Sequence, residues 1–290
     1  MKKLLSRAND YLSLVKFSHT VFAMPFALAG YFLGATLPGY GFSLRTFLLV
    51  LACMVLARSA AMGFNRYADA RFDSKNPRTA GREIPSGKIR QSNALVFVII
   101  SSLLFIAAAA LLNRLTLVLS PVALFIILGY SYTKRFTPLS HLVLGLGLSL
   151  APAGAFIAVT GTLMLLPVVY SFIVLTWVSG FDIIYSLQDD QFDRDTGLFS
   201  IPAVMSRSKA MAVSTALHAL TVILVIVAGF MGETGWIFRA GALIFVAMLT
   251  YQHLIVKPDD LSRVNLAFGT TNGIASIIFG AAIITDLFIR

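Results

Sequence analysis

Two acidic segments contain residues whose types and spacing could bind a hard metal ion. The first contains Asn65, Asp69 and Asp73, and the second contains Asp182, Tyr185, Asp189 and Asp193. If each segment is helical, steps of 100° per residue place its set on one helix face. Carboxylates stacked at this spacing repel one another, so each stripe needs cations. Carboxylate and amide oxygens without nearby His or Cys suit Mg²⁺, which often bridges to substrate phosphates.

The two segments have the same internal spacing. Asp69 and Asp189 are 120 residues apart, and so are Asp73 and Asp193. This regularity predicts a repeated unit whose two acidic stripes face each other across a cavity. The alternative is that the carboxylates only pair with the many nearby arginines. Two further acids fall off the stripe and are expected to be surface or turn residues, namely Asp190 and Asp195.

Other polar residues are predicted to lie at or below the level of these acids. Arg58 precedes Asn65 by seven residues, so both project from nearly the same helix face. An arginine at membrane depth normally faces the interior of a bundle, and Arg58 should therefore reach into the cavity. Asp182 should lie deeper than Asp189. A further segment carries phenols and cations that could serve the site or anchor the chain at the membrane interface, namely Tyr130, Tyr132, Lys134 and Arg135.

The elements that position these residues follow from composition. Only 12% of the 290 residues are charged, against roughly 25% in soluble domains, and 58% are hydrophobic. A helix that spans the bilayer needs about 20 apolar residues, so the long charge-free runs are predicted spans. We expect an all-α polytopic membrane protein with nine transmembrane helices around a central cavity. The predicted helices cover 17–37, 43–64, 94–113, 115–133, 139–160, 163–184, 211–231, 234–256 and 265–287.

This composition excludes soluble, disordered, disulfide-rich secreted and nucleic-acid-binding proteins. We expect one domain over 1–290, built from four-helix units at 17–133 and 139–256 and a ninth helix at 265–287.

The basic residues predict the orientation. Of the 23 lysines and arginines, 18 fall in the N-terminal segment and in the loops after even-numbered spans. By the positive-inside rule, the N-terminus and the acidic motifs face the cytoplasm, and the C-terminus lies outside the inner (plasma) membrane.

Across essentially its whole length the chain resembles the UbiA superfamily of intramembrane prenyltransferases. The resemblance rests on N-x-x-x-D-x-x-x-D at 65–73, R-x-x-x-R-x-x-P-S-G at 78–87, Y-x-x-x-K-R at 130–135 and D-x-x-Y-x-x-x-D-x-x-x-D at 182–193. Within the family, the chain is most similar to the 4-hydroxybenzoate polyprenyltransferases of quinone synthesis. The segments 16–27 and 180–189 also resemble relatives that act on a dihydroxynaphthoate in futalosine-route menaquinone synthesis.

The resemblance implies an enzyme that transfers a polyprenyl group from its diphosphate to an aromatic acid. The expected acceptor is 4-hydroxybenzoate, for ubiquinone or menaquinone, and the alternative is 1,4-dihydroxy-6-naphthoate. Two Mg²⁺ ions would be held by Asn65, Asp69, Asp73, Asp189 and Asp193. The other implied substrate-binding residues are Arg58, Tyr130, Tyr132, Lys134, Arg135, Tyr185, Lys16 and His19. The implied catalytic residues are Asp182, Lys134 and Arg135.

Within this resemblance, Lys134 and Tyr130 would contact the diphosphate, while Arg58, Arg135 and Asp182 would lie near the acceptor. Many members have a second acid where this chain has Arg66, so no metal-ligand role is expected there. Oligomeric state and tail length stay open. A cation-coupled transporter is the alternative of a different class, although the acids lie near span ends rather than at the midplane.

Overall fold

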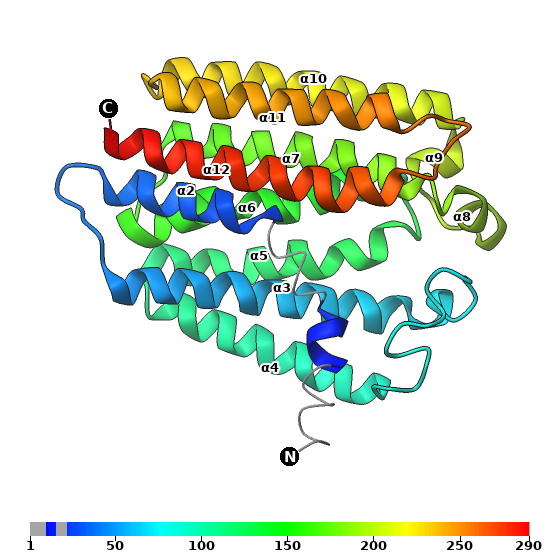
Figure 1. Ribbon diagram of the computed structural model, residues 1–290. Coiled ribbons are helices and arrows are strands. Elements are labelled where there is room, and N and C mark those ends of the chain that lie inside the picture. Colours follow the sequence, from blue (N-terminus) through cyan, green and yellow to red (C-terminus); the bar gives the residue numbers. More distant parts are fainter. Residues whose placement is uncertain (1–9, 16–21, 290) are drawn as a thin grey trace.

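The computed structural model describes residues 10–15 and 22–289, and the described chain contains helices and no β-strand. The helices are Met24–Ala35 (α2), Leu44–Asp73 (α3), Gln91–Ala110 (α4), Arg114–Thr133 (α5), Ser140–Thr160 (α6), Leu165–Ser186 (α7), Asp190–Thr196 (α8), Ile201–Val204 (α9), Arg207–Met231 (α10), Trp236–Ile255 (α11) and Asn272–Ile289 (α12), with the π-helix Leu266–Thr271 (η2) directly before α12. The long helices lie side by side along one axis (Figure 1).

The prediction of an all-α polytopic membrane protein is confirmed. Among the described residues, eight helical segments are long and apolar enough to cross a membrane, and α2 is a shorter apolar helix. These segments correspond to the nine predicted spans, although part of the first span lies outside the described residues. The second span continues beyond its predicted end at 64 to Asp73, so the first acidic motif is helical as assumed. The division into two repeated units stays a prediction.

Local sequence signals explain several helix ends. Ser43 and Asn113 precede α3 and α5, and each side chain accepts a hydrogen bond from the backbone N–H three residues later. Such caps satisfy donors that the first helical turn leaves free. Gly161 ends α6 with φ +69°, a left-handed conformation that glycine adopts without steric cost. The break between the predicted spans 139–160 and 163–184 is therefore present.

The bundle holds together through small residues and aromatic packing. An added Cβ at Gly30 of α2 would lie 2.1 Å from the backbone oxygen of Pro152 in α6, and at Gly145 of α6 it would lie 2.5 Å from that of Leu175 in α7. Such close approach is how apolar helices associate in lipid. Trp177 of α7 is fully buried in the main aromatic core. Large apolar side chains also point outward, where lipid can cover them.

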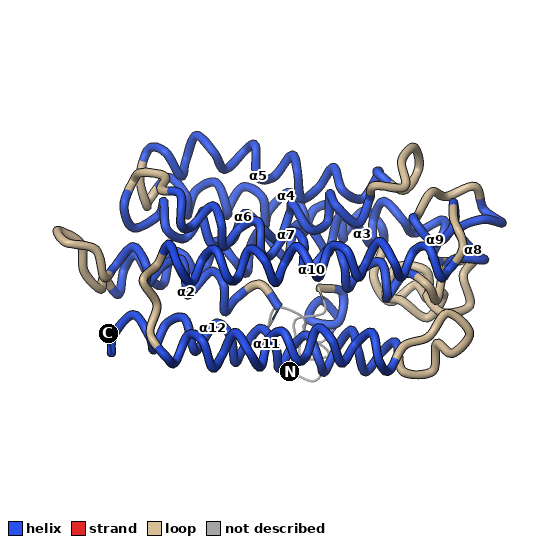
Figure 2. The backbone as a smooth tube through the Cα atoms, turned by 90° about the horizontal axis from the view of Figure 1, so that it is seen from above, coloured by secondary structure: helices blue, strands red, loops and turns tan. Residues whose placement is uncertain are grey.

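One end of the bundle gathers the polar loops. The loop after α3, together with α8 and α9, lies at this end, whereas α12 runs to the opposite end (Figures 1 and 2). Both acidic motifs adjoin these connections in the sequence. The fold therefore brings two distant segments of the chain to one place.

Candidate active site

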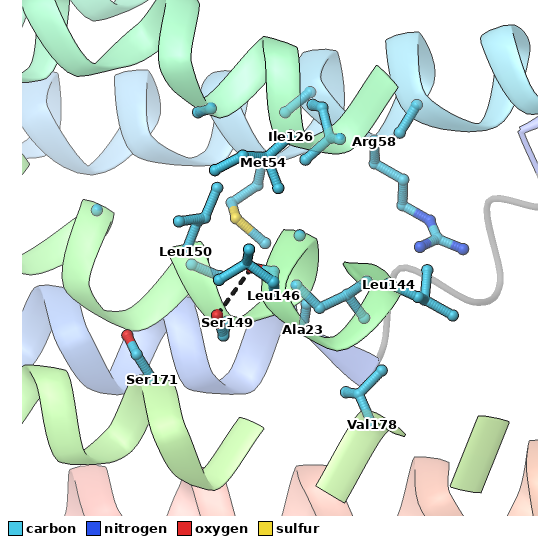
Figure 3. A pocket seen from close by; sticks show the side chains of 18 of the residues that line it. Ala23, Met54, Arg58, Ile126, Leu144, Leu146, Ser149, Leu150, Ser171 and Val178 are labelled. Carbon is cyan, nitrogen blue, oxygen red and sulfur yellow. Dashed lines mark hydrogen bonds between the residues drawn. The ribbon is translucent and has the colours of Figure 1, made fainter. Parts of the chain in front are cut away.

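An elongated cavity of about 630 Å³ lies inside the bundle. Its walls come mainly from α3, α5, α6 and α7, with Phe268 of η2. Most of its lining is apolar, and Met54, Ile126 and Leu150 lie around one part of it (Figure 3). The polar lining consists chiefly of Arg58, Asn65, Arg66, Arg82, Tyr130, Asp182 and Tyr185. The cavity thus joins an apolar compartment to a cluster of charged and hydrogen-bonding groups.

Two arginines in this wall each have a buried guanidinium nitrogen with no hydrogen-bond partner among the described residues. Figure 3 shows Arg58 extending from α3 toward the cavity, as predicted. The Nε atoms of Arg58 and Arg66 are buried without a hydrogen-bond partner, and neither residue forms an ion pair within the described chain. Arg66 is only 3% exposed. An unpaired buried charge costs free energy, so both positions favour an anionic ligand.

Polar contacts link the residues of the first acidic motif to one another and to two arginines outside it. Asn65 Nδ2 donates to Asp69 Oδ2 at 2.9 Å. Arg82 Nη1 donates to Asp73 Oδ1 at 2.6 Å, while Asp73 Oδ2 is buried without a hydrogen-bond partner among the described residues. Arg135 lies 3.7 Å from Asp69. One carboxylate oxygen of the motif is therefore left for an additional ligand.

The second acidic motif is bound by the loop that follows the first. Arg78 donates to both carboxylate oxygens of Asp189, and Asn76 Nδ2 donates to Oδ1 at 3.1 Å. Burial would raise the pKa of the Asp189 carboxyl, but the hydrogen bonds and charge of Arg78 and the bond from Asn76 lower it below its usual range. Asp189 is therefore a carboxylate at neutral pH.

Lys134 makes the matching contact with the last acid of the motif. Its Nζ donates to Asp193 Oδ2 at 3.1 Å. Burial would lower the pKa of Lys134, but the charges of Asp193, Asp182 and Asp189 raise it. The ammonium therefore stays charged. The interpretation that these acids pair with nearby basic residues thus describes the ligand-free protein, because four of them each contact a lysine or arginine, namely Asp69, Asp73, Asp189 and Asp193.

The donor chemistry fits Mg²⁺. The two motifs offer carboxylate and amide oxygens, including the free oxygen of Asp73. Among residues 10–15 and 22–289, no three His, Cys, Asp or Glu side chains lie close enough to hold a metal ion by themselves. Mg²⁺ typically retains waters and shares substrate phosphates, so such a site requires few direct protein ligands.

Asp182 lies in the cavity wall and has a partner that we did not expect. Its Oδ2 lies 2.7 Å from Nδ1 of His141, which is fully buried on α6. The spacing of the four histidines indicated no shared site, and the two residues are 41 positions apart in the sequence. The one signal in the sequence was that His141 is a polar residue inside a long charge-free run, which favours a buried polar partner.

The remaining predicted residues divide into two groups. Tyr130 and Tyr185 line the cavity, and the Tyr185 hydroxyl accepts a hydrogen bond from Arg78 at 3.2 Å. Tyr132 and Arg135 are not in the cavity lining; the Arg135 guanidinium lies 4.6 Å from the centre of the Tyr132 ring. Lys16 and His19 lie outside the described residues.

Two expectations for the second motif were wrong. The helix does not continue from 182 to 193, because α7 ends at Ser186 and a turn places Asp189 immediately before α8. Leu187 in this turn is fully buried, and its apolar packing stabilises the break. Asp190 is not a surface residue.

Asp190 is only 1% exposed and pairs with Arg194 and Arg207. Burial would raise the pKa of this carboxyl, but the hydrogen bonds and charge of Arg207 and the charge of Arg194 lower it.

Both the sequence and the structure of the chain are similar to those of known proteins. The profile of the UbiA prenyltransferase family matches residues 23–278. The chain belongs to this family. A UbiA homologue from Aeropyrum pernix K1 has a similar structure, with 37% identity, a TM-score of 0.83 and coverage of 92% of this chain and 98% of that one.

More distant UbiA relatives share the fold or the sequence pattern. An Archaeoglobus fulgidus UbiA homologue bound to DMAPP and Mg²⁺ has a TM-score of 0.77 at 21% identity, covering 97% of this chain and 100% of that one. A 4-hydroxybenzoate octaprenyltransferase of Aeromonas hydrophila is 29% identical over 244 residues, 84% of this chain and 85% of the relative. One of Aeromonas salmonicida is 30% identical over 236 residues, 81% of each chain.

Membership of the UbiA family confirms the prediction of a prenyltransferase and disfavours the transporter alternative.

Proposed function

We propose that this protein transfers a prenyl group from a prenyl diphosphate to 4-hydroxybenzoate in quinone biosynthesis, with Mg²⁺ as cofactor. The observation that carries the proposal is one cavity whose long apolar wall meets two unpaired guanidiniums and Asp182. The octaprenyltransferase names of relatives at 29–30% identity support this acceptor. The A. fulgidus homologues bound to DMAPP or GPP with Mg²⁺ support the donor and the metal.

The diphosphate would bind at the end of the cavity where the two motifs meet. Two Mg²⁺ ions would be held there by Asn65, Asp69, Asp73, Asp189 and Asp193. When bound, Mg²⁺ neutralises charge that develops on the leaving diphosphate. Lys134 stays protonated next to Asp193 and adds a fixed cation at this level.

The apolar wall would hold the prenyl chain and exclude water. Met54, Ile126 and Leu150 present hydrocarbon to this part of the cavity (Figure 3). An allylic cation is rapidly trapped by water, so a dry compartment protects it until the acceptor ring attacks. The prenyl chain is as apolar as the cavity wall. A membrane protein therefore suits this reaction, because its interior can hold the chain and exclude water at the same time.

The acceptor would be oriented by groups of opposite charge. The Arg58 guanidinium pairs with no carboxylate among the described residues, and it matches an aromatic carboxylate in charge and fork geometry. Asp182 would accept a hydrogen bond from the acceptor hydroxyl and receive its proton as the ring carbon forms the new bond. The two residues together select an aromatic acid that carries a hydroxyl group.

The enzyme is proposed to lie in the inner (plasma) membrane with its polar end toward the cytoplasm. The loop after α3 and the connections around α8 and α9 lie at that end (Figure 1), and the basic residues of these loops favour the cytoplasmic side. The last helix, α12, runs to the opposite end (Figure 1), which supports the proposal that the C-terminus lies outside.

The decisive experiment offers purified protein a short allylic diphosphate with 4-hydroxybenzoate and 1,4-dihydroxy-6-naphthoate in parallel, with and without Mg²⁺. We expect Mg²⁺-dependent product with 4-hydroxybenzoate. Product only with the naphthoate would replace the acceptor and keep the reaction class. No product with either, together with cation flux in liposomes, would overturn the proposal.

A further inference from the structure

A buried histidine supports Asp182 from behind the cavity wall. Asp182 lines the cavity and its side chain is 15% exposed, whereas His141 is fully buried and is not part of the lining. The 2.7 Å contact uses only Oδ2 of Asp182. Its Oδ1 has no hydrogen-bond partner in the described part of the chain, so one oxygen is held by the protein and the other is available.

The surroundings of His141 determine its tautomer. The backbone N–H of Ile201 donates to Nε2 at 3.3 Å, so Nε2 must be the unprotonated, accepting nitrogen. The ring proton is then on Nδ1, where it donates to the carboxylate of Asp182. A doubly protonated ring would place two N–H groups against each other at Ile201. Nδ1 is therefore the donor in the contact with Asp182, and Nε2 is the acceptor at Ile201.

Close helix packing keeps this pair in register. Gly145 lies one turn after His141 on α6, and an added Cβ there would be 2.3 Å from Ser179 Oγ and 2.5 Å from Leu175 O. Ser179 Oγ also donates to the backbone oxygen of His141 at 3.1 Å. The α6–α7 spacing that brings His141 to Asp182 is thus set by backbone contacts next to the pair.

We propose that His141 is a positioning residue that holds the Asp182 carboxyl group in place through Oδ2, with Oδ1 directed at the hydroxyl of the aromatic acceptor. This inference rests on the proposed function. His141 does not touch substrate; it acts through Asp182, as outer residues orient metal ligands and catalytic groups. Without the Nδ1 donor, the Asp182 side chain would be free to turn away from the acceptor.

Loss of the hydrogen bond from His141 to Asp182 should slow only the step that uses the acceptor. Binding of the prenyl diphosphate is proposed to depend on Mg²⁺ and on four acids with their basic partners, none of which contacts His141, namely Asp69, Asp73, Asp189 and Asp193. Removing the donor should therefore lower kcat and leave KM for the diphosphate unchanged. A general loss of folding would instead affect both.

Two substitutions of His141 distinguish the loss of the hydrogen-bond donor from the loss of side-chain volume. His141→Leu fills the space without an N–H donor. In His141→Asn, the amide nitrogen takes the place of Nδ1 and can donate to Asp182. Both variants lose the contact with Ile201, so their difference reports the Asp182 bond alone. The matched control is His218→Asn, since His218 is a buried histidine that donates to Trp177 O on the opposite side of α7.

Steady-state kinetics with a short allylic diphosphate and the acceptor that the wild type uses provide the test. We expect His141→Leu to lower kcat about 10- to 100-fold, the range for loss of an outer-shell partner, at unchanged KM for the diphosphate. His141→Asn should recover most of kcat, and His218→Asn should match the wild type.

Wild-type kcat in His141→Leu would overturn the inference, and so would equal losses in the Leu and Asn variants. Either result leaves the proposed function standing. A wild-type protein that transfers no prenyl group to either acceptor would overturn both.

Discussion

Replacing Arg58 by methionine should stabilise the ligand-free protein and remove its response to the acceptor. The Arg58 Nε is buried without a partner, and much of the surrounding wall is apolar (Figure 3). Replacement of buried ion pairs by well-packed apolar residues has stabilised proteins by about 1–4 kcal/mol. Because Arg58→Met removes a single charge rather than a pair, we expect the lower part of this range, about 1–2 kcal/mol.

The ligand should reverse this order of stability. An acceptor at 100 times its Kd stabilises the protein that binds it by about 2.7 kcal/mol. If the acceptor carboxylate pairs with Arg58, the wild type gains this amount and Arg58→Met gains little. The wild type with acceptor should therefore be more stable than the variant with acceptor, although the variant is the more stable of the two without it.

Thermal unfolding in detergent, with and without 4-hydroxybenzoate, measures both effects. Arg45→Met is the control, because Arg45 is an exposed arginine at the other end of the same helix. It should change neither the unfolding midpoint without acceptor nor the shift that the acceptor produces. A lower midpoint for ligand-free Arg58→Met, or an acceptor shift equal to that of the wild type, would refute the reasoning.

Three further predictions concern the metal motifs, pH and helix packing. Asp69→Ala or Asp189→Ala should abolish Mg²⁺-dependent prenyl transfer in isolated membranes without preventing insertion, and full activity in either variant would contradict the metal assignment. Folding lowers the pKa of Asp189 and Asp190, so their stabilisation is complete above the usual carboxyl pKa of about 4 and is lost as pH falls through the lowered values. The difference in unfolding midpoint between the wild type and Asp190→Asn should therefore be constant above about pH 5 and should shrink as the pH falls below about 4. Gly30→Ala places a methyl group 2.1 Å from the backbone oxygen of Pro152. This clash should lower the free energy of unfolding by about 1–3 kcal/mol, offset by up to about 1 kcal/mol from the higher helix propensity of alanine. An unchanged unfolding midpoint would show that α2 and α6 can move apart without cost.

The amino-acid sequence by itself determined the membrane architecture and the site's location along the chain. Apolar runs of bilayer length predict helices regardless of their partners, because the lipid requires every backbone group to be bonded within its own segment. The same local reasoning predicted Arg58 in the cavity, since its place relative to Asn65 depends only on helix geometry.

The tertiary structure alone decided which charges meet. Arg78 binds Asp189 across 111 positions, and His141 binds Asp182 across 41, so neither pair follows from local spacing. The break after Ser186 and the burial of Asp190 also depend on packing against α9 and α10. Helix periodicity predicts which face of a helix each residue lies on. It does not predict which other helix packs against that face. That depends on which helices can approach closely, and here small residues such as Gly145 permit the approach.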